Sequence, residues 1–474
     1  MTNPIQAILI GAGQRGAEAY GAYALSHPED VHFVAVAEPD TGRRERFAAM
    51  HAISPEYQFE SWEPLLARPL LAQAALICTQ DQMHTPPALS ALDRGYDVLL
   101  EKPMATSLAE CQQLVQSAEE NGRQLHIAHV LRYTPHFQKM REIIQSGALG
   151  QIVHVNHQEN VSFWHMAHSY VRGNWRSTAQ SSPMILAKCC HDLDILIWLL
   201  NDTCQTMSST GNLLHFRPEN MPVGAPAYCV DGCPAADSCP FFAPPIYADR
   251  IPLWRSMADS ASGITRQATQ WQLRSPRLVR ALSKVIPPLR QVSEYRGWPS
   301  NLVSSDGERE HIMAELARSP YGRCVYQCDN DVVDHQVVNM VFTNGTTVTL
   351  TMHGLSHDEG RTTRIQGARG ELEAAFLVAG SWIEVREHRT GKRTRYDTTA
   401  HRSSGHGGGD AGLMAGFAAA LRQNDPSLAL TSARFSLESH LMAFAAEDAR
   451  LGSEIIQMEA YRKYDLLPKK WTSG

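Results

Sequence analysis

The stretch Ala7-Ile8-Leu9-Ile10-Gly11-Ala12-Gly13-Gln14-Arg15-Gly16 decides the fold of the N-terminal part of this chain. Its opening residues are all apolar, as expected of a strand that is buried on both faces of a parallel sheet. The glycine-rich turn follows without a gap, and the residues from Ala17 onward predict a helix. In such a turn the glycines permit the tight bend, let a pyrophosphate approach the positive end of the helix, and pack the helix against the strand. The residues expected to bind a dinucleotide here are Gly11, Gly13, Gln14, Arg15 and Gly16.

An acidic residue follows the next predicted strand. Residues 32–37 form a second apolar run that ends at Glu38, where a carboxylate can accept hydrogen bonds from an adenosine ribose. Glu38 would repel a 2′-phosphate, which favours NAD over NADP. Arg43 and Arg44 lie just downstream and would suit such a phosphate, so NADP stays the second choice. The alternative interpretation makes Glu38 a solvated residue at a strand end.

Buried strands alternate with helical segments through this N-terminal part. Residues 74–79, 98–100 and 124–129 are further strand-like runs, with helical patterns between them. The alternation predicts an α/β fold with a doubly wound parallel sheet. We therefore expect a Rossmann domain over residues 1–132.

Three motifs carry a resemblance to a known family. A predicted strand runs into Glu101-Lys102-Pro103, residues 79–84 follow another strand, and His191-Asp192-Leu193-Asp194 lies farther along the chain. Together they resemble the Gfo/Idh/MocA oxidoreductases, the glucose-fructose oxidoreductase and inositol dehydrogenase family, closely over residues 5–200 and more loosely over residues 330–450. The resemblance adds to the expected cofactor site Thr79, Gln80, His84, Glu101 and Lys102.

The resemblance implies an active site as well as a fold. Lys102 would contact the substrate hydroxyl that is oxidised, His191 would be its acid–base partner, and Asp194 would lie at the substrate. The chemistry is consistent, because an imidazole can accept the hydroxyl proton near neutral pH and an ammonium can stabilise the developing alkoxide. The family also implies a sugar or polyol substrate, a second domain with an open mixed β-sheet, and a homodimer or homotetramer built through that sheet.

The chain departs from the family pattern beside the expected histidine. Four residues before His191 the family usually has Asp, whereas this chain has Ala187, followed by Lys188. We hypothesise that Lys188 enters the site instead and binds an anionic or hydroxyl-rich group, although helical spacing brings it to the face of His191 only roughly. Cys189 and Cys190 are interpreted as small packing residues rather than nucleophiles.

The remaining sequence predicts an α+β domain over residues 133–474. Residues 332–341 and 346–352 alternate apolar and polar side chains, as half-buried strands do. At about residues 205–325 lies a cysteine-containing insertion, much of which lacks strand periodicity. Its amphipathic, basic stretch at 276–286 is interpreted as a helix packed on its own protein rather than on a membrane.

Residues 163–176 concentrate side chains that bind sugars. The segment has no clean helix or strand period, and its polar and aromatic side chains suit hydroxyls, sugar rings and anionic groups. We interpret it as a substrate loop, the alternative being an ordinary loop with structural aromatics. In a second candidate, the turn His406-Gly407-Gly408-Gly409-Asp410, either His406 reaches the pocket or Asp410 simply caps the next helix. The residues expected at the substrate are His165, His168, Tyr170, Arg172, Asn174, Trp175, Arg176 and His406.

Four cysteines are candidate zinc ligands. Cys229, Cys233 and Cys239 lie close together amid Gly and Pro, and Cys324 and Cys328 follow later. Four thiolates would form a tetrahedral structural zinc site, for which we prefer Cys328 as the fourth ligand. Reduced loop thiols and a single disulfide are the competing interpretations, and a cytoplasmic setting disfavours the disulfide.

Composition limits the class of protein. The chain has 474 residues, a formal net charge of -6 and 19% charged residues, which gives no general attraction to nucleic acid or anionic membranes. No apolar run approaches the roughly 20 residues of a membrane span, and the N-terminal sequence lacks a signal-peptide pattern. We expect a cytoplasmic protein with a small-molecule carbohydrate substrate and with neither nucleic acid nor a membrane as partner.

Three functions stay open. The first is an NAD-dependent oxidoreductase acting on a sugar, polyol or glycoside hydroxyl. The second is a glycoside hydrolase in which bound NAD oxidises a ring hydroxyl, the acidified neighbouring C–H loses its proton, the aglycone leaves, water adds and NADH returns the hydride. The third is a non-catalytic NAD-binding sensor, against which the presence of Lys102 and His191 argues.

Overall fold

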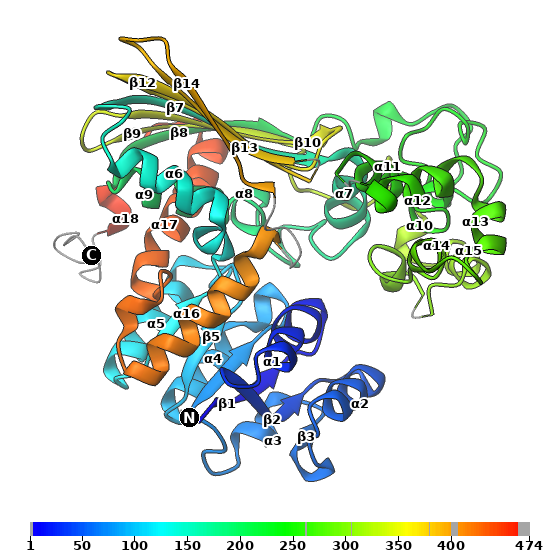
Figure 1. The fold of residues 1–474 in the computed structure, drawn as a ribbon, viewed down its shortest axis with the longest axis horizontal. Coiled ribbons are helices and arrows are strands. Elements are labelled where there is room, and N and C mark those ends of the chain that lie inside the picture. The colour runs from blue at the N-terminus through cyan, green and yellow to red at the C-terminus, as the bar shows by residue number, and fades with distance from the viewer. Residues whose placement is uncertain (1–2, 261–262, 305, 379, 400–405, 463–474) are drawn as a thin grey trace.

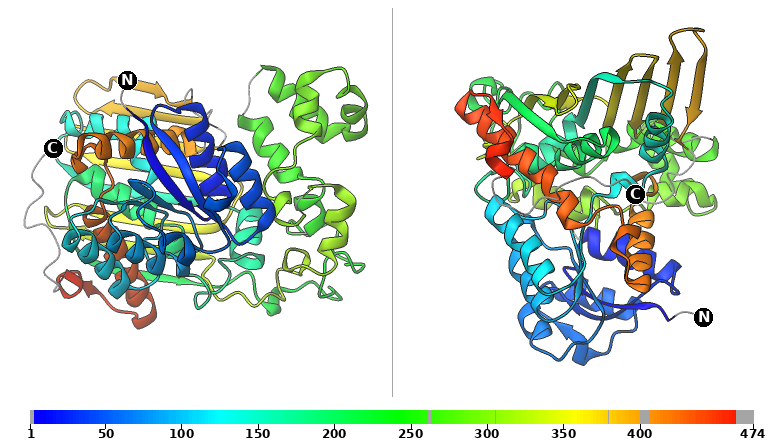
Figure 2. Two further views of the ribbon diagram at one scale, coloured as in Figure 1. Left: turned by 90° about the horizontal axis from the view of Figure 1, so that it is seen from below. Right: turned by 90° about the vertical axis from the view of Figure 1, so that its left-hand side faces the viewer.

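Two β-sheets and a helical outgrowth make up the computed structural model of the chain (Figure 1). Helices lie between the sheets, and the outgrowth projects to one side of the second sheet (Figure 1, Figure 2). The structure describes residues 3–260, 263–304, 306–378, 380–399 and 406–462.

The first sheet is the predicted doubly wound sheet, which is thereby confirmed. Its six strands are all parallel in the order β3-β2-β1-β4-β5-β6, so the strand order reverses between β1 and β4, where such sheets bind ligands. Ile8 and Leu76 are fully buried because helices cover both faces. The strands are β1 Ile5–Ile10, β2 Val31–Ala37, β3 Gln58–Phe59, β4 Ala74–Ile77, β5 Asp97–Leu100 and β6 Leu125–Ile127. The helices are a π-helix Gln14–Gly21, α1 Ala22–Ser26, α2 Thr41–Met50, α3 Trp62–Leu66, α4 Thr85–Asp93 and α5 Leu108–Glu120.

The second sheet has nine strands in the order β14-β13-β12-β11-β7-β10-β9-β8-β15. The β7–β10 pair is parallel and the other pairs are antiparallel, which confirms the predicted mixed sheet. Along β7, Val155, His157 and Glu159 are buried while Asn156 and Gln158 are exposed, so one face is covered and the other open. The strands are β7 Ile152–Ser162, β8 Cys204–Asn212, β9 His335–Phe342, β10 Thr347–Ser356, β11 Gly360–Gly367, β12 Gly370–Leu377, β13 Gly380–Glu387, β14 Arg393–Asp397 and β15 Ile456–Gln457.

Helices from both halves of the sequence fill the space between the sheets (Figure 1). Leu413 and Phe417 of α16 pack in one cluster with Leu9 of β1, so a helix close to the C-terminus covers the first sheet. The domain boundary at residue 132 stays a prediction, because α16 belongs spatially with the residues before it. The helices in the parts of the chain between the first sheet and the outgrowth and after the second sheet are α6 Pro135–Gln145, α7 Phe163–His165, a π-helix Met166–Arg172, α8 Met184–Ala187, α9 Cys190–Leu200, α16 Gly409–Gln423, α17 Ala433–Gly452 and α18 Glu459–Arg462. Of these, α7 lies beside the outgrowth (Figure 1).

The helical outgrowth occupies much of the predicted insertion. It has one small apolar cluster of its own, which contains Trp254, Val279 and Leu289, and a second that it shares with Trp164 of α7. The start of the predicted insertion differs, because β8 at Cys204–Asn212 is a strand of the second sheet. No helix in the described parts of the chain is long and apolar enough to cross a membrane. The helices are α10 Ala243–Tyr247, α11 Ile251–Ser260, α12 Gly263–Arg274, α13 Pro276–Leu282, α14 Pro287–Ser293 and α15 Arg309–Leu316.

Candidate active site

A cavity of about 700 Å³ is lined by residues from both sheet-bearing parts of the chain. Lys102, which follows β5, contributes from the first part, while His191 of α9 and Arg361 of β11 contribute from the second. The end of β5 is a carboxyl edge of the parallel sheet, the edge at which doubly wound sheets bind ligands. This cavity is the candidate active site.

Lys102 and His191 have the surroundings that an acid–base pair needs. Lys102 Nζ donates a hydrogen bond of 2.8 Å to the main-chain oxygen of Ala187, so position 187 contacts the ammonium through its backbone. His191 is buried, and its Nδ1 lies 3.4 Å from Nδ1 of His129. Burial and the positive charge of Lys102 hold the pKa of His191 well below its usual value. The imidazole is therefore neutral at pH 7 and able to accept a proton.

Lys188 also lies on the wall of the cavity. It follows the short helix α8, and α9 begins only at Cys190, so Lys188 and His191 are not on one continuous helix. Helical spacing therefore does not limit how closely Lys188 and His191 can face the same cavity. Lys188 Nζ lies 3.1 Å from Glu359 Oε1 and 3.3 Å from Glu159 Oε1. Burial opposes its charge, yet these two carboxylates raise the pKa of Lys188 overall.

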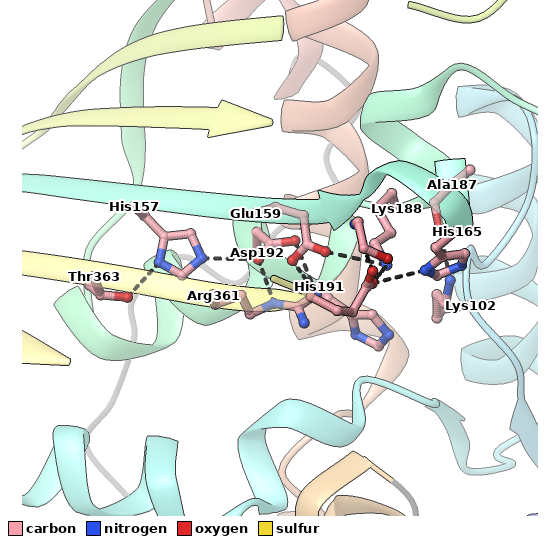
Figure 3. A network of polar contacts seen from close by, with 12 residues as sticks. Lys102, His157, Glu159, His165, Ala187, Lys188, His191, Asp192, Arg361 and Thr363 are labelled. Carbon is pink, nitrogen blue, oxygen red and sulfur yellow. Dashed lines mark hydrogen bonds and ion pairs between the residues drawn. The ribbon is translucent and has the colours of Figure 1, made fainter. Parts of the chain in front are cut away.

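A buried charge network extends from Lys188 along the covered face of the second sheet (Figure 3). Arg361 lies 2.8 Å from Glu159 and 2.7 Å from Asp192, and His157 Nε2 lies 2.9 Å from Asp192. Burial raises the pKa of Glu159 to about 7, against the opposing influence of Arg361 and Lys188. Burial works against ionisation of Asp192 too, but Arg361 and His157 lower its pKa to about 2. The network thus holds one firmly ionised carboxylate and one that titrates near neutrality.

A second acid–base pair touches the cavity beside Lys188. His165 Nδ1 lies 2.9 Å from Glu359 Oε1, and both residues line the cavity together with Tyr170. Although burial disfavours its charge, His165 and Lys188 hold the pKa of Glu359 well below its usual value. The cavity therefore contains a histidine–carboxylate pair in addition to Lys102 and His191.

The glycine-rich turn is shaped for a ligand. Gly11 has φ +94°, and a Cβ there would lie 2.6 Å from the main-chain oxygen of Cys78, while a Cβ at Gly16 would lie 2.1 Å from the oxygen of Gly11. At Gly13, by contrast, a Cβ would meet no described atom within 4 Å. The outer two glycines are therefore required by packing, and the middle one leaves space in which a pyrophosphate fits.

Glu38 lies against this turn rather than in solvent. It is buried, and its carboxylate accepts hydrogen bonds from Ala12 N at 2.8 Å and Asp40 N at 3.0 Å. Arg44 Nη1 donates to the main-chain oxygen of Glu38, which occupies it locally, and the exposed Arg43 lies 3.5 Å from the Glu38 carboxylate. A carboxylate at the edge of the turn suits the ribose hydroxyls of NAD better than a 2′-phosphate.

The guanidinium of Arg15 is held by partners within the protein, and its role as a cofactor ligand stays a prediction. The guanidinium lies 2.7 Å from Glu101 and 2.7 Å from Asp410, and donates to Tyr20 Oη at 2.9 Å. Asp410 also lies 3.1 Å from Nδ1 of His406, which is on the cavity wall. The alternative in which Asp410 is an N-cap is wrong, because Gly408 holds the N-cap position of α16. Arg15 thus joins the glycine-rich turn to β5 and α16.

The loop after β4 is held by its own histidine. His84 is buried, with Nδ1 2.7 Å from the oxygen of Pro103 and Nε2 3.1 Å from the oxygen of Thr79. Thr79 Oγ1 donates to the oxygen of Met83 at 3.0 Å, and Gln80 is exposed. His84 therefore positions Thr79 and the segment after Lys102, and its ring is occupied by the protein itself.

The predicted substrate loop is only partly at the cavity. His165, Tyr170 and Trp175 line it, and so does His406 from the other predicted segment. The other predicted residues do not line the cavity. The buried ones among them have hydrogen-bond partners elsewhere in the protein, as buried polar atoms generally do. Arg172 donates to the main-chain oxygens of Arg323 and Phe241, His168 contacts Tyr247, Arg176 pairs with Asp329, and Asn174 is exposed. Arg172 and His168 therefore hold parts of the protein together rather than facing the cavity.

Asp194 also differs from its predicted place at the substrate. Both of its carboxylate oxygens accept hydrogen bonds of 2.6 Å from the guanidinium of Arg132. Asp194 and Arg132 are both buried, and an unpaired charge there would be strongly destabilising. The pair joins α9 to the segment after β6.

The cysteine prediction is not supported by the geometry. All ten cysteines are free thiols. Among the described residues, no group of three or more His, Cys, Asp or Glu side chains is arranged to hold a metal ion. Cys229, Cys233 and Cys239 do line one small cavity, but with Cys324 in place of the preferred Cys328. Cys189 and Cys190 are buried in the main apolar cluster.

Sequence reasoning missed several residues of the site. Glu159 and Glu359 contact Lys188 from segments far apart in the chain, and Arg361 pairs with Glu159. His129 contacts His191 across 62 positions. For Glu159 a signal existed, because an acidic residue within a strand-like run is unusual unless its charge is paired. For Arg361, Glu359 and His129, no local sequence pattern indicated a place in the site.

Two family profiles match the chain. Residues 5–129 match a profile described as "Oxidoreductase family, NAD-binding Rossmann fold", and residues 137–230 match one described as "GFO/IDH/MocA C-terminal domain". The helical outgrowth lies after the second match.

Curated relatives match less than half of the chain, whereas solved structures superpose on nearly all of it. A 2,7-anhydro-N-acetylneuraminate hydratase of Mediterraneibacter gnavus is 23% identical over 44% of this chain and 52% of its own length. An inositol 2-dehydrogenase of Salmonella typhimurium is 27% identical over 43% of this chain and 56% of its own length. The matches thus span about half of these relatives. An Agrobacterium radiobacter oxidoreductase, solved with NAD+, L-tartaric acid and magnesium, superposes with a TM-score of 0.62 at 14% identity, covering 97% of this chain and 99% of that one.

Proposed function

We propose that this chain, which carries both domains of the Gfo/Idh/MocA oxidoreductases, transfers a hydride between NAD and the hydroxyl-bearing carbon of a sugar, polyol or glycoside. One observation carries the proposal: Lys102 and a neutral His191 line the same cavity, at the carboxyl edge of a sheet that also bears the glycine-rich turn. The two groups supply the charge stabilisation and the proton acceptor that alcohol oxidation requires.

The chain's own residues divide the work of this reaction. Gly13 and Glu38 fit the pyrophosphate and ribose of NAD, whose nicotinamide ring accepts the hydride when it is bound. Lys102, held by the oxygen of Ala187, stabilises the alkoxide as the hydroxyl proton leaves. His191 Nε2 or Nδ1 accepts that proton, and His129 lies within reach of its ring.

A redox glycosidase is the second candidate, favoured by the His165–Glu359 pair. Elimination of an aglycone requires removal of a carbon-bound proton beside the new ketone, a task separate from deprotonating the hydroxyl. His165, Glu359 and Tyr170 line the cavity and supply groups for that step. Similarity to a protein named as a hydratase supports the same alternative.

Proton NMR in deuterated water distinguishes the two reactions. The chain is incubated with NAD and a panel of sugars and glycosides. A ketosugar with stoichiometric NADH identifies a dehydrogenase, whereas a cleaved glycoside that carries deuterium beside the anomeric carbon, without net NADH, identifies a redox glycosidase. Lys102→Met is the matched variant, and we expect it to abolish either conversion. Conversion that survives in Lys102→Met contradicts the role given to Lys102, whereas silence of the wild type across a broad panel contradicts the proposed reaction and favours an NAD-binding sensor.

A further inference from the structure

A second cavity lies within the helical outgrowth, apart from the candidate active site. It has a volume of about 640 Å³ and is lined by α11, α12, α13 and α14 and by the segments on either side of them. Its lining shares no residue with the cavity that contains Lys102. Its size is typical of small-molecule sites. Figure 1 shows these helices gathered in the outgrowth beside the second sheet.

Arginines dominate the lining of this cavity. Two of them have carboxylate partners that also line it, since Arg296 lies 2.8 Å from Glu308 and Arg309 lies 3.1 Å from Asp249. The other three arginines give the cavity an excess of positive charge. In all, five arginines line it, namely Arg250, Arg277, Arg280, Arg296 and Arg309.

The three remaining arginines lack a carboxylate partner within the described part of the chain. Arg250 uses Nη2 for a 2.8 Å hydrogen bond to the oxygen of Gly307, and Arg277 and Arg280 of α13 are exposed residues of the lining. Burial and the neighbouring Arg296 lower the pKa of Arg250. An anion in the cavity would relieve this repulsion.

Buried polar atoms around the cavity point to a ligand. Arg250 is 9% exposed and Trp254 is 2% exposed, yet Nε of Arg250 and Nε1 of Trp254 have no hydrogen-bond partner among the described residues. Buried donors are normally satisfied, so two orphan donors in one cationic cavity call for an acceptor from outside the chain. Oε1 of Gln272 is likewise without a partner in the described chain and would accept a bond from a ligand hydroxyl.

We propose that this cavity binds the phosphate group of a small phosphorylated molecule. Guanidinium groups bind phosphate oxygens in pairs of parallel hydrogen bonds, and three arginines without carboxylate partners converge here. The orphan donors of Arg250 and Trp254 supply further bonds to oxyanions, and Gln272 suits a hydroxyl of the organic portion. The site lies outside both regions matched by the family profiles and does not depend on the proposed reaction.

Isothermal titration calorimetry on the full chain tests the proposal. The probes are inorganic pyrophosphate, inorganic phosphate, glucose 6-phosphate and AMP, with glucose and sulfate as controls. We expect pyrophosphate or a phosphate ester to bind, and the double variant Arg277→Ala/Arg280→Ala to weaken that binding about tenfold or more, because two charge-assisted contacts are lost. Comparing the affinity for inorganic phosphate with the affinities for glucose 6-phosphate and AMP then shows whether the site prefers free phosphate or a phosphate ester.

Arg266→Ala is the matched control. Arg266 is an exposed arginine of α12 that does not line the cavity, so its removal changes charge without changing the site. Equal binding by the double variant and the wild type overturns the proposal. So does sulfate binding as tightly as pyrophosphate, or an absence of binding by all four phosphates at millimolar concentration. Thermal melting of both variants checks that the outgrowth stays folded, and Arg277 and Arg280 were chosen because both are exposed.

Discussion

Glu159 is a single residue whose ionisation should be visible in the stability of the whole chain. Burial raises its pKa to about 7, above the roughly 4.3 of an unfolded glutamate. The folded state therefore binds the proton more tightly, so the stabilisation from this residue is fully present at low pH and is lost as pH rises toward 7. Glu159→Gln cannot titrate, and we expect it to gain stability relative to the wild type between about pH 5 and pH 7.

The difference in thermal midpoint between Glu159→Gln and wild type, followed from acidic to slightly alkaline pH, measures this effect. Glu373→Gln is the control, since Glu373 lies on β12 in a partly exposed position. A difference for Glu159→Gln that stays constant with pH would show that the carboxylate is ionised throughout, through Lys188 and Arg361.

At the scale of elements, α16 is tied to the glycine-rich turn through Arg15 and Asp410. Asp410→Asn keeps the shape of the side chain but removes the charge that Arg15 contacts at 2.7 Å. We expect a loss of about 1.5–2 kcal/mol in the free energy of unfolding, at the lower end of the range for a hydrogen bond to a charged group, together with weaker NAD binding because the turn is less well held. Arg422→Gln, at the other end of α16, breaks the pair with Asp30 and should leave NAD affinity unchanged. NAD titration by protein fluorescence checks both variants, and equal affinity in Asp410→Asn would refute the coupling.

The same elements show what sequence could and could not predict. Five of the six strands of the first sheet follow from short apolar runs, which are local signals, and these runs were predicted; the two-residue strand β3 at Gln58–Phe59 was not. The partnership of Arg15 with Asp410 joins residues 395 positions apart and has no local signature. Arg172 was misjudged for a related reason, since its type suits an anion but its burial against the oxygens of Arg323 and Phe241 is decided by tertiary packing.

At the scale of the whole molecule, the second sheet is open on one side. Helices between the two sheets cover one face, and the other face carries a row of paired positions formed by Gln158, Thr362, Ala375 and Trp382 (Figure 1, Figure 2). A groove on this face is lined by Trp382 together with polar residues of the neighbouring strands. Sheets with one uncovered face pack readily against a second sheet.

We propose that two copies of the chain pack through this face. Light scattering after size-exclusion chromatography should then give about twice the 52.6 kDa of one chain. Trp382→Glu places a charge in the groove on this face, on β13, where desolvation opposes its burial, and we expect it to shift the population to monomers. Leu278→Glu, on the exposed side of α13, adds the same charge away from the sheet and should leave the assembly intact. A monomeric wild type at micromolar concentration, or a Trp382→Glu variant that stays dimeric, would place the interface elsewhere or exclude it.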